Sequence, residues 1–345
     1  MSNPQDYTVG WICAISTERV AARAFLDEEH AGPEYVQTND NNDYTLGRVG
    51  KHNVVIAVAP DGEYGTQSAA AVARDMMHTF PNVRIGLMVG VAGGVPCCHR
   101  QSCQSQPCHK QSCHKQDVRL GDIVVCSPGQ GKGGLYQYDY GERVQEQDFQ
   151  TTGYLNQPPT LLRTAVVGLR DQYETHGHQL ERAINGVLEK IPRLRKKYQR
   201  PDPKTDRLYL SNIKHPAKDK RDCSEICAQD PSQFVPRGIR TTEDDNPTIH
   251  YGLIASGNTL VKDAIIRDAA AEEGILCFEM EAAGLMNHFP CLVIRGVCDY
   301  SDSHKNKQWQ GYAAMAAAAY SRDLLLRIPQ NKVEAEKPFR HAVSG

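Results

Sequence analysis

Acidic residues directly follow two apolar runs in the C-terminal third of the chain, and this placement constrains the fold more than any other feature. Residues 275–278 are apolar and are followed by Glu279 and Glu281. A second strand-like segment begins with the apolar run at residues 291–294, continues through Arg295 to Cys298, and is followed by Asp299. An open α/β sheet binds its ligand just beyond the carboxyl ends of its strands. These segments therefore predict buried strands that deliver carboxylates to a ligand site.

Strand-like and helix-like segments alternate along most of the chain. Strands are predicted at residues 7–14, 44–49, 54–59, 83–89, 123–127, 134–140, 250–256, 275–278 and 291–298. Helices are predicted at residues 18–29, 65–78, 159–173, 179–190, 260–272 and 281–288, with a long alanine-rich helix ending near residue 328. Such alternation is typical of a layered α/β domain, and a single domain accounts for the length.

Two segments interrupt this pattern. Residues 192–247 are rich in Pro, Asp, Lys and Ser and have little periodicity, which indicates a long connecting excursion without a core of its own. Residues 97–116 form a Cys/His/Gln/Ser tract of low complexity. We therefore expect one domain at residues 7–328, interrupted by both segments and followed by a disordered tail at residues 331–345.

The twelve cysteines divide into two groups. Five lie in the 97–116 tract, where thiolates and imidazoles could bind zinc or copper, but the spacing predicts no fixed tetrahedral set and a disordered insertion is favoured. The other seven are scattered, and those inside apolar runs are expected to be buried thiols. Cys223 and Cys227 have no second pair nearby, so the sequence predicts no metal site there.

Charge and hydropathy exclude several classes of partner. Lys and Arg number 39 against 41 Asp and Glu, and the net charge of −2 gives no bulk attraction to nucleic acid or to an anionic membrane. No run approaches the roughly 20 apolar residues of a membrane helix, and the N-terminus lacks the pattern of a signal peptide. We therefore expect a cytoplasmic protein.

Basic residues gather in the first part of the excursion, between residues 193 and 207. A solvated surface is the ordinary interpretation of such a run. The alternative is a lid that reads phosphate, in which Arg207 and, from a later segment, Lys262 would contact a substrate phosphate. The sequence leaves both interpretations open.

The acidic segments also allow a catalytic and a structural interpretation. Asp299, at a strand end in a shielded pocket, could hold a proton and act as a general acid, or it could cap a turn. Glu281 could accept hydrogen bonds from sugar hydroxyls, or it could complement the dipole of a following helix.

A glycine-rich turn is expected at residues 90–94. Such a turn would let backbone amides approach a ligand closely.

Several segments, in their order along the chain, resemble the nucleoside phosphorylase and nucleosidase superfamily. They are residues 9–14, 90–94, 119–125, 252–257 and 279–281, together with Asp299. The resemblance covers nearly the whole chain outside the two insertions and is nearest to the fungal branch, whose members often form the N-terminal domain of multi-domain receptor-like proteins. It implies a three-layer α/β/α sandwich with a mixed central sheet, in a homo-oligomer whose catalysis needs neither a metal nor an organic cofactor.

The resemblance also implies roles for individual residues. Asp299 matches the proton donor to the purine ring, and Glu18 matches the water-activating carboxylate of methylthioadenosine/S-adenosylhomocysteine nucleosidases. Met280 and Glu281 match the pair that binds ribose. Further substrate contacts are expected from Phe278, Gly93, Ser256, Gly257, Asn258 and Leu260.

The sequence departs from the family pattern at three positions. Bacterial hexameric phosphorylases hold inorganic phosphate with an Arg and a Ser where this chain has Met88 and Val91, a lining that would hold phosphate poorly. Asn258 replaces an Asp found in many relatives. We therefore expect hydrolysis of purine nucleosides or nucleotides, with phosphorolysis as the alternative. A purine-sensing module with little or no turnover is a further alternative, less favoured because no signalling segment follows within the 345 residues.

Overall fold

The computed structural model describes residues 1–96, 117–129, 131–146, 149–217, 219, 221, 223–227, 230–241, 244–305 and 307–341. The Cys/His tract at residues 97–116, predicted to be a disordered insertion, lies outside this described part. Among the helices of the described part, none combines the length and the hydropathy that a membrane-spanning segment needs.

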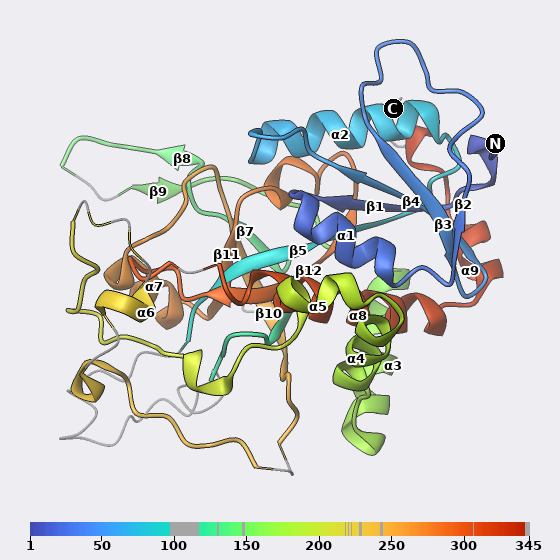
Figure 1. Cartoon of the computed structure of the whole chain (residues 1–345). Coiled ribbons are helices and arrows are strands. Elements are labelled where there is room, and N and C mark those ends of the chain that lie inside the picture. The colour runs from blue at the N-terminus through green and yellow to red at the C-terminus, as the bar shows by residue number, and fades with distance from the viewer. Residues whose placement is uncertain are drawn as a thin grey trace.

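A mixed β-sheet forms the centre of the molecule (Figure 1). Its strands are β1 (Val9–Cys13), β2 (Glu28–His30), β3 (Tyr44–Val49), β4 (His52–Val58), β5 (Ile85–Gly94), β6 (Ile123–Cys126), β7 (Leu135–Gln137), β10 (Ile249–Ser256), β11 (Ile275–Glu279) and β12 (Cys291–Asp299). The order across the sheet is β11-β10-β6-β12-β5-β1-β4-β3-β2, and β7 pairs with β10. A separate hairpin joins β8 (Gly141–Glu142) to β9 (Gln150–Thr151).

The ends of three strands meet at Gly93. Because β11 pairs with both β10 and β5, the strands β5, β12, β6, β10 and β11 close into a ring. Gly93 lies opposite Asp299 of β12 and Phe278 of β11. The glycine-rich residues 90–94 therefore belong to a strand, and the turn predicted there is wrong. The glycines at positions 90, 93 and 94 leave room for neighbouring side chains to approach this strand closely.

Helices cover the sheet and the edges of the ring. They are α1 (Ser16–Ala24), α2 (Thr66–Thr79), α3 (Thr160–His176), α4 (Leu180–Lys190), α5 (Arg195–Tyr198), α6 (Cys223–Ile226), α7 (Ala264–Glu272), α8 (Gln310–Arg327) and α9 (Gln330–Ala335). Short 3-10 helices are η1 (Pro4–Asp6), η4 (Pro192–Leu194), η5 (Pro203–Thr205), η6 (Pro231–Gln233), η7 (Ala282–Gly284) and η8 (Phe339–His341).

The alanine-rich helix α8 lies directly on the sheet. It contacts β12 and β5, and α1, α3, α4 and α5 pack around it, whereas α2 contacts β1 and β4 (Figure 1). A Cβ atom at Gly296 of β12 would lie 1.9 Å from the carbonyl oxygen of Ala313. Small residues on both elements thus allow the helix backbone to touch the strand, and this contact fixes the end of β12 that carries Asp299.

The C-terminal segment is ordered where the sequence predicted a disordered tail. Helix α9 buries Val333 completely, and the Phe339 ring packs against Phe289 with centroids 5.0 Å apart. The Phe339 amide also donates a hydrogen bond of 2.9 Å to the carbonyl of Val83. Two buried apolar side chains therefore anchor this polar segment, and the prediction is wrong for residues 331–341. Residues 342–345 lie outside the described part.

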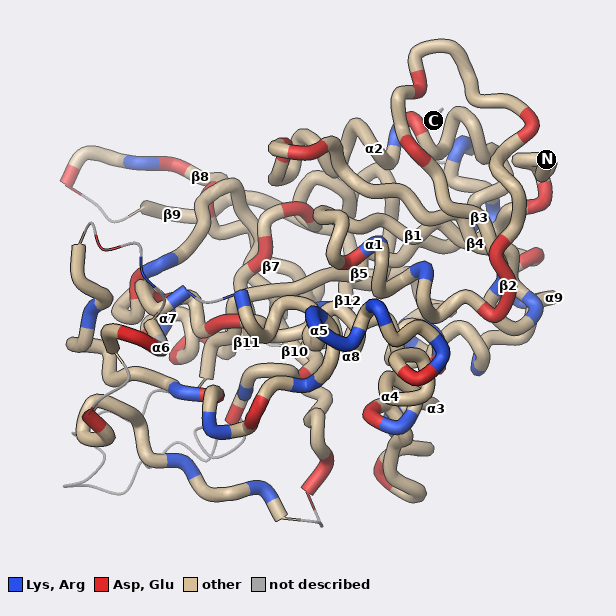
Figure 2. Tube along the Cα trace, in the orientation of Figure 1, with Lys and Arg blue, Asp and Glu red and all other residues tan. Residues whose placement is uncertain are grey.

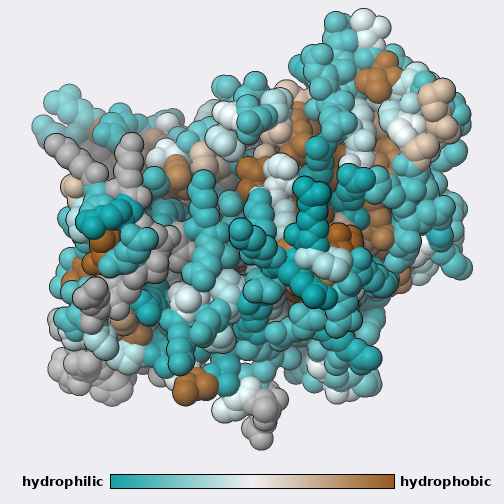
Figure 3. Space-filling model, in the orientation of Figure 1, coloured by the Kyte–Doolittle hydropathy of each residue, from teal (hydrophilic) through white to brown (hydrophobic). Residues whose placement is uncertain are grey.

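In its described part, the excursion at residues 192–247 forms the short helices η4, α5, η5, α6 and η6, joined by irregular chain. Figure 2 shows consecutive basic residues on α5. One of them, Lys197, donates a hydrogen bond of 2.7 Å to Thr17 Oγ1, so part of this charge is bound to the protein itself. The face shown in Figure 3 is mainly hydrophilic, with apolar residues in separate patches.

Candidate active site

One cavity of about 620 Å³ brings the three predicted carboxylates together. Glu18 reaches it from α1, Glu281 from the segment after β11, and Asp299 from the end of β12. Its volume falls in the range of small-molecule sites. Other predicted contacts that line it are Gly93, Leu260, Lys262, Phe278 and Met280.

Glu18 is 3% exposed and is held by backbone amides. Its Oε2 accepts hydrogen bonds from the amides of Ala14 (2.7 Å) and Ile15 (3.1 Å), and its Oε1 accepts one from Val91 (2.8 Å). Burial raises the pKa of Glu18, against the opposite pull of Arg295 and of the three amides. A fixed carboxylate with a raised pKa is suited to take a proton from water.

Arg295, which sequence analysis did not assign to the site, connects these carboxylates. It is fully buried in β12, forms an ion pair with Glu279, and its Nη2 lies 3.2 Å from Glu281 Oε2. Glu18 lies close by, since a Cβ atom at Gly90 would be 2.4 Å from Glu18 Oε1 and 2.5 Å from Arg295 Nη1. A buried cation needs such partners. A single Arg inside an otherwise apolar strand was the signal in the sequence.

Glu281 enters the cavity from a short turn, and the helix predicted at residues 281–288 is wrong. The Glu279 carboxylate accepts hydrogen bonds from the amides of Glu281 (3.2 Å) and Ala282 (3.1 Å). Ser256 Oγ accepts one of 2.9 Å from the amide of Ala283. These side-chain acceptors bind amides at the start of the segment, and only the 3-10 turn η7 forms.

The electrostatics of Glu281 differ from those of an exposed Glu. Burial raises the pKa of Glu281 to about 7, with Arg295 opposing the rise and with Glu279 and Glu18 adding to it. The carboxylates of Glu18, Glu279 and Glu281 lie around the guanidinium of Arg295, so oxygen acceptors predominate in this part of the site. Such a site favours a ligand that donates hydrogen bonds or develops positive charge.

Asp299 lies beside a cation that the sequence analysis did not identify. Lys305 Nζ contacts Asp299 Oδ1, and the Ser301 amide donates to the same oxygen at 2.9 Å. Both Lys305 and Ser301 line the cavity. A Cβ atom at Gly93 would lie 2.2 Å from Ser301 Oγ and 2.9 Å from Asp299 Oδ1, so only glycine leaves room for this arrangement. No pattern in the sequence marks Lys305.

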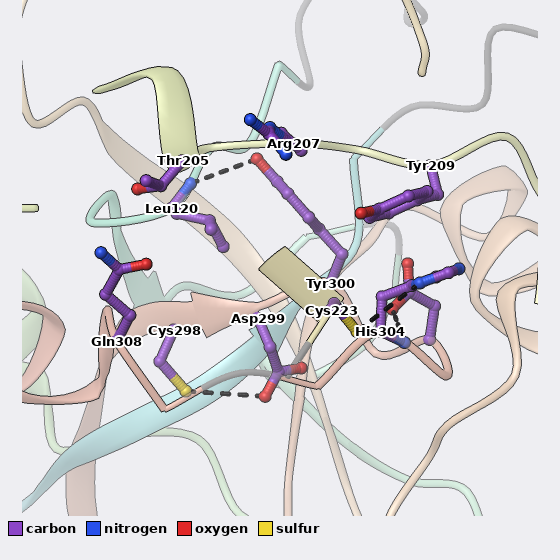
Figure 4. Close-up of a pocket in the computed structure, with 11 residues that line it drawn as sticks. Leu120, Thr205, Arg207, Tyr209, Cys223, Cys298, Asp299, Tyr300, His304 and Gln308 are labelled. Atoms are coloured by element: carbon purple, nitrogen blue, oxygen red, sulfur yellow. Dashed lines mark hydrogen bonds between the residues drawn. The ribbon is translucent and has the colours of Figure 1, made fainter. Parts of the chain in front are cut away.

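Four residues predicted to contact substrate lie outside the lining of this cavity. Asn258 Oδ1 accepts a hydrogen bond of 3.0 Å from the amide of Thr66 and thereby caps the start of α2. Ser256 is fully buried under the turn at η7, and Gly257 follows it in the chain. Arg207 lines a separate cavity of about 100 Å³ (Figure 4). Asn258 and Ser256 thus bind backbone amides of the protein itself, and Arg207 belongs to the excursion.

A comparison with protein-family models found no match. A nucleotide-binding leucine-rich repeat (NLR)-like protein of Hyaloscypha variabilis is 42% identical over 340 residues. The matched region covers 98% of this chain and 30% of that protein, so the chain spans less than a third of the length of its relative.

Solved structures of nucleosidases match almost the whole chain. The 5′-methylthioadenosine/S-adenosylhomocysteine nucleosidase of Neisseria meningitidis, in complex with methylthio-immucillin-A, has a TM-score of 0.53 and 14% identity, and covers 92% of this chain and 98% of its own. The chain has the nucleosidase fold. Futalosine hydrolase of Helicobacter pylori matches with a TM-score of 0.52 and 13% identity, and the match covers 93% of this chain and 97% of the hydrolase. The S-adenosylhomocysteine nucleosidase of Streptococcus pyogenes has a TM-score of 0.52 and 18% identity, and the match covers 95% of this chain and 99% of that nucleosidase. The predicted resemblance to the nucleoside phosphorylase and nucleosidase superfamily is confirmed at the level of the fold.

Proposed function

We propose that this chain hydrolyses the N-glycosidic bond of purine nucleosides or nucleotides. The observation that carries the proposal is the shared cavity of Glu18, Glu281 and Asp299. Cleavage of this bond needs an acid for the leaving base, a polar partner for the sugar hydroxyls and a base for the attacking water. The three carboxylates meet these needs from three separate elements, and the nucleosidase fold of the chain agrees with this chemistry.

In the proposed reaction the C–N bond breaks first and its electron pair goes to the base. Asp299 gives the base a proton, while Glu281 accepts hydrogen bonds from the sugar hydroxyls and stabilises the positive charge that develops on the sugar. Water then attacks the anomeric carbon, and Glu18 takes its proton. One proton has moved from Asp299 to Glu18, and exchange with solvent restores both groups.

Water is favoured over phosphate as the nucleophile because of what surrounds Glu18. The Val91 amide is bound to Glu18 Oε1 at 2.8 Å, and Met88 is fully buried. A phosphate placed there would meet the Glu18 carboxylate and would lack the Arg and Ser of the phosphorylase pattern. Phosphorolysis is the alternative that this arrangement opposes.

The nucleotide version of the proposal is supported by lysines of the cavity. Lys262, Lys305 and Lys307 all line it, and ammonium groups bind phosphate oxygens through charge-assisted hydrogen bonds. A phosphorylated sugar could therefore be held at the same site as the ribose. Faster turnover of a nucleotide than of its nucleoside would support this version, and the reverse order would contradict it.

We further propose that residues 7–328 form one domain, a three-layer sandwich interrupted at residues 97–116 and 192–247, which assembles as a homo-oligomer. One cluster of buried side chains extends from Tyr7 through Phe339, which supports a single domain. Light scattering on the purified chain tests the assembly, and a monomeric mass at micromolar concentration would contradict it.

A sensing module that binds purines with little or no turnover is the second candidate, favoured by one observation. The chain matches 30% of a longer protein named as NLR-like, and this match supports a binding role within a larger assembly. Incubation with adenosine, inosine, methylthioadenosine, AMP and ATP, followed by chromatography of the free base, separates the two candidates. Base release supports the nucleosidase. Purine binding by calorimetry without base release from any of the five would favour the sensor.

A further inference from the structure

Two histidines and two cysteines from distant segments converge beside the candidate active site. They are His215, Cys223 and Cys227 of the excursion and His304 of the loop after β12, and their ligand atoms lie within 4.8 Å of one another. His215 Nδ1 is 3.1 Å from Cys223 Sγ and 3.4 Å from Cys227 Sγ. His304 Nδ1 is 3.8 Å from Cys223 Sγ. A tetrahedral zinc with bonds of about 2.0–2.3 Å places its ligand atoms about 3.3–3.8 Å apart, so these distances are close to those of a metal site.

The second nitrogen of each imidazole fixes which atom faces the sulfur atoms. His215 Nε2 lies 2.9 Å from the carbonyl oxygen of Asp219, and His304 Nε2 lies 3.2 Å from that of Ile213. A carbonyl oxygen only accepts, so Nε2 of each ring carries the hydrogen. Nδ1 of each neutral ring then presents its lone pair toward the thiols. Metal-binding histidines are commonly oriented by such an outer hydrogen bond.

Three of the four side chains of the cluster are buried. Cys223, Cys227 and His304 are between 5% and 8% exposed. Cys223 begins the helical turn α6 and Cys227 directly follows it, with the Cys227 amide donating a hydrogen bond of 2.9 Å to the carbonyl of Cys223, so the two cysteines lie on one face. The His304 ring stacks on Tyr209 with centroids 3.6 Å apart. The four side chains are therefore placed before any ion binds.

We propose that His215, Cys223, Cys227 and His304 bind one structural Zn²⁺ ion. Two thiols lose their protons when the ion binds, and two thiolates neutralise its charge, so the filled site buries no net charge. Nitrogen and sulfur ligands in a tetrahedral arrangement select zinc among the common divalent ions. Four protein ligands complete the coordination, which is the arrangement of a structural site. The sequence did not predict this set of ligands because His304 is 81 residues from Cys223.

The position of the site gives it a mechanical consequence. His304 directly precedes Lys305, whose ammonium contacts Asp299. Figure 4 shows Cys223, Asp299 and His304 around one small cavity. Asp299 also lines the larger cavity, whereas the four residues of the cluster do not. A zinc ion there would tie the excursion to the loop that carries Lys305 and would hold that loop in place. The histidines and cysteines act through this loop as positioning residues, and they do not contact the substrate.

Metal analysis of the full chain, purified with zinc present and under reducing conditions, tests the proposal. We expect one tightly bound zinc per chain, and its loss in Cys223→Ser/Cys227→Ser. A matched control replaces Cys97, Cys98, Cys103, Cys108 and Cys113 with Ser, because the tract at residues 97–116 is the other place where thiols are dense. The control is expected to keep the zinc. Zinc that disappears with the tract and persists in the double variant would overturn the proposal, as would a parent protein without zinc.

A second measurement does not depend on whether the variants fold. X-ray absorption at the zinc edge of the parent protein is expected to show two sulfur ligands at about 2.3 Å and two nitrogen ligands at about 2.0–2.1 Å. Removal of the ion with a strong chelator is expected to lower the melting temperature. A shell of oxygen and nitrogen only, or four sulfur ligands, would contradict the assignment to these residues.

Discussion

The amide of Val91 donates a hydrogen bond of 2.8 Å to Oε1 of Glu18, so a carboxylate binds the strand amide beside the cavity. In the phosphorylase pattern this position belongs to a side chain that holds phosphate. A carboxylate at the same place repels an anion and attracts a proton. This single contact links the identity of the nucleophile to a residue that can be changed.

Glu18→Gln is expected to reduce kcat by about 10²–10⁴, because the amide cannot take the proton of the attacking water. The KM should change little, since the sugar and the base contact other residues. Steady-state base release checks both values. Glu34→Gln makes the same chemical change at an exposed position and should leave kcat unaltered. Equal kcat in the Glu18 variant and the parent would remove Glu18 from the reaction.

Asp299→Asn is expected to slow release of a purine by about 10²–10⁴, since the base then leaves without a proton. A riboside of p-nitrophenol, whose leaving group is stable as an anion, should be much less affected. Parallel assays of the two substrates check this difference, with Asp171→Asn on the surface of α3 as the control. An equal loss on both substrates would argue that Asp299 only supports the structure.

Gly93→Ala is expected to lower kcat/KM at least tenfold, about 1.4 kcal/mol in transition-state stabilisation. The added Cβ would lie 2.9 Å from Asp299 Oδ1 and 2.2 Å from Ser301 Oγ, so the acid has to move. Gly186→Ala is the matched control, because a Cβ there meets nothing within 4 Å. The control should keep its activity and gain a little stability from helix propensity. Unchanged kcat/KM in the Gly93 variant would show that the position of Asp299 is not critical.

Arg295→Met is expected to destabilise the protein by about 3–5 kcal/mol, because it leaves Glu279 and Glu281 buried without their cation. Urea unfolding at neutral pH measures the loss. Arg74→Met removes an exposed arginine that pairs with Asp75 and should destabilise the protein far less. A loss of similar size in both variants would mean that the buried network contributes little.

Glu281 is expected to make stability depend on pH. Its pKa is raised from an ordinary 4.5 to about 7 in the folded protein. The folded state therefore holds this proton more tightly than the unfolded state, so the contribution to stability is fully present below pH 4.5 and is lost as the pH rises through about 7. Urea unfolding at pH 5 and pH 8 should show a loss of on the order of 3 kcal/mol at the higher pH, reduced in Glu281→Gln. The same loss in the variant would assign the effect to other groups.

The main elements of the fold could be predicted from local patterns. The hairpin of β3 and β4 and the helix α8 follow from apolar periodicity and from small residues, which act over short distances in the chain. The turn at η7 could not be predicted, because its amides are bound by the side chains of Glu279 and Ser256, one of them from a different strand. The C-terminal segment also escaped prediction, since Phe339 finds its partner Phe289 only after folding.

The candidate site shows the same division. Glu281 and Asp299 could be predicted from their places after strands, and Glu18 from the family resemblance alone. All three line one cavity. Arg295 and Lys305 were not assigned roles because their importance lies in contacts between strands and loops. Asn258 was expected to contact substrate, but its amide oxygen caps α2. A short polar side chain near a site can bind substrate or can cap a helix. The sequence does not distinguish these two roles, whereas the hydrogen bonds in the structure do.

The identity of the sugar product tests the proposed hydrolysis most directly. The purified chain is incubated with the nucleoside or nucleotide that releases base fastest, in H₂¹⁸O, with and without inorganic phosphate, and the sugar is examined by mass spectrometry. Hydrolysis through Glu18 predicts a free sugar that carries one ¹⁸O atom, formed at the same rate in both buffers. A sugar 1-phosphate that forms only when phosphate is present would contradict it.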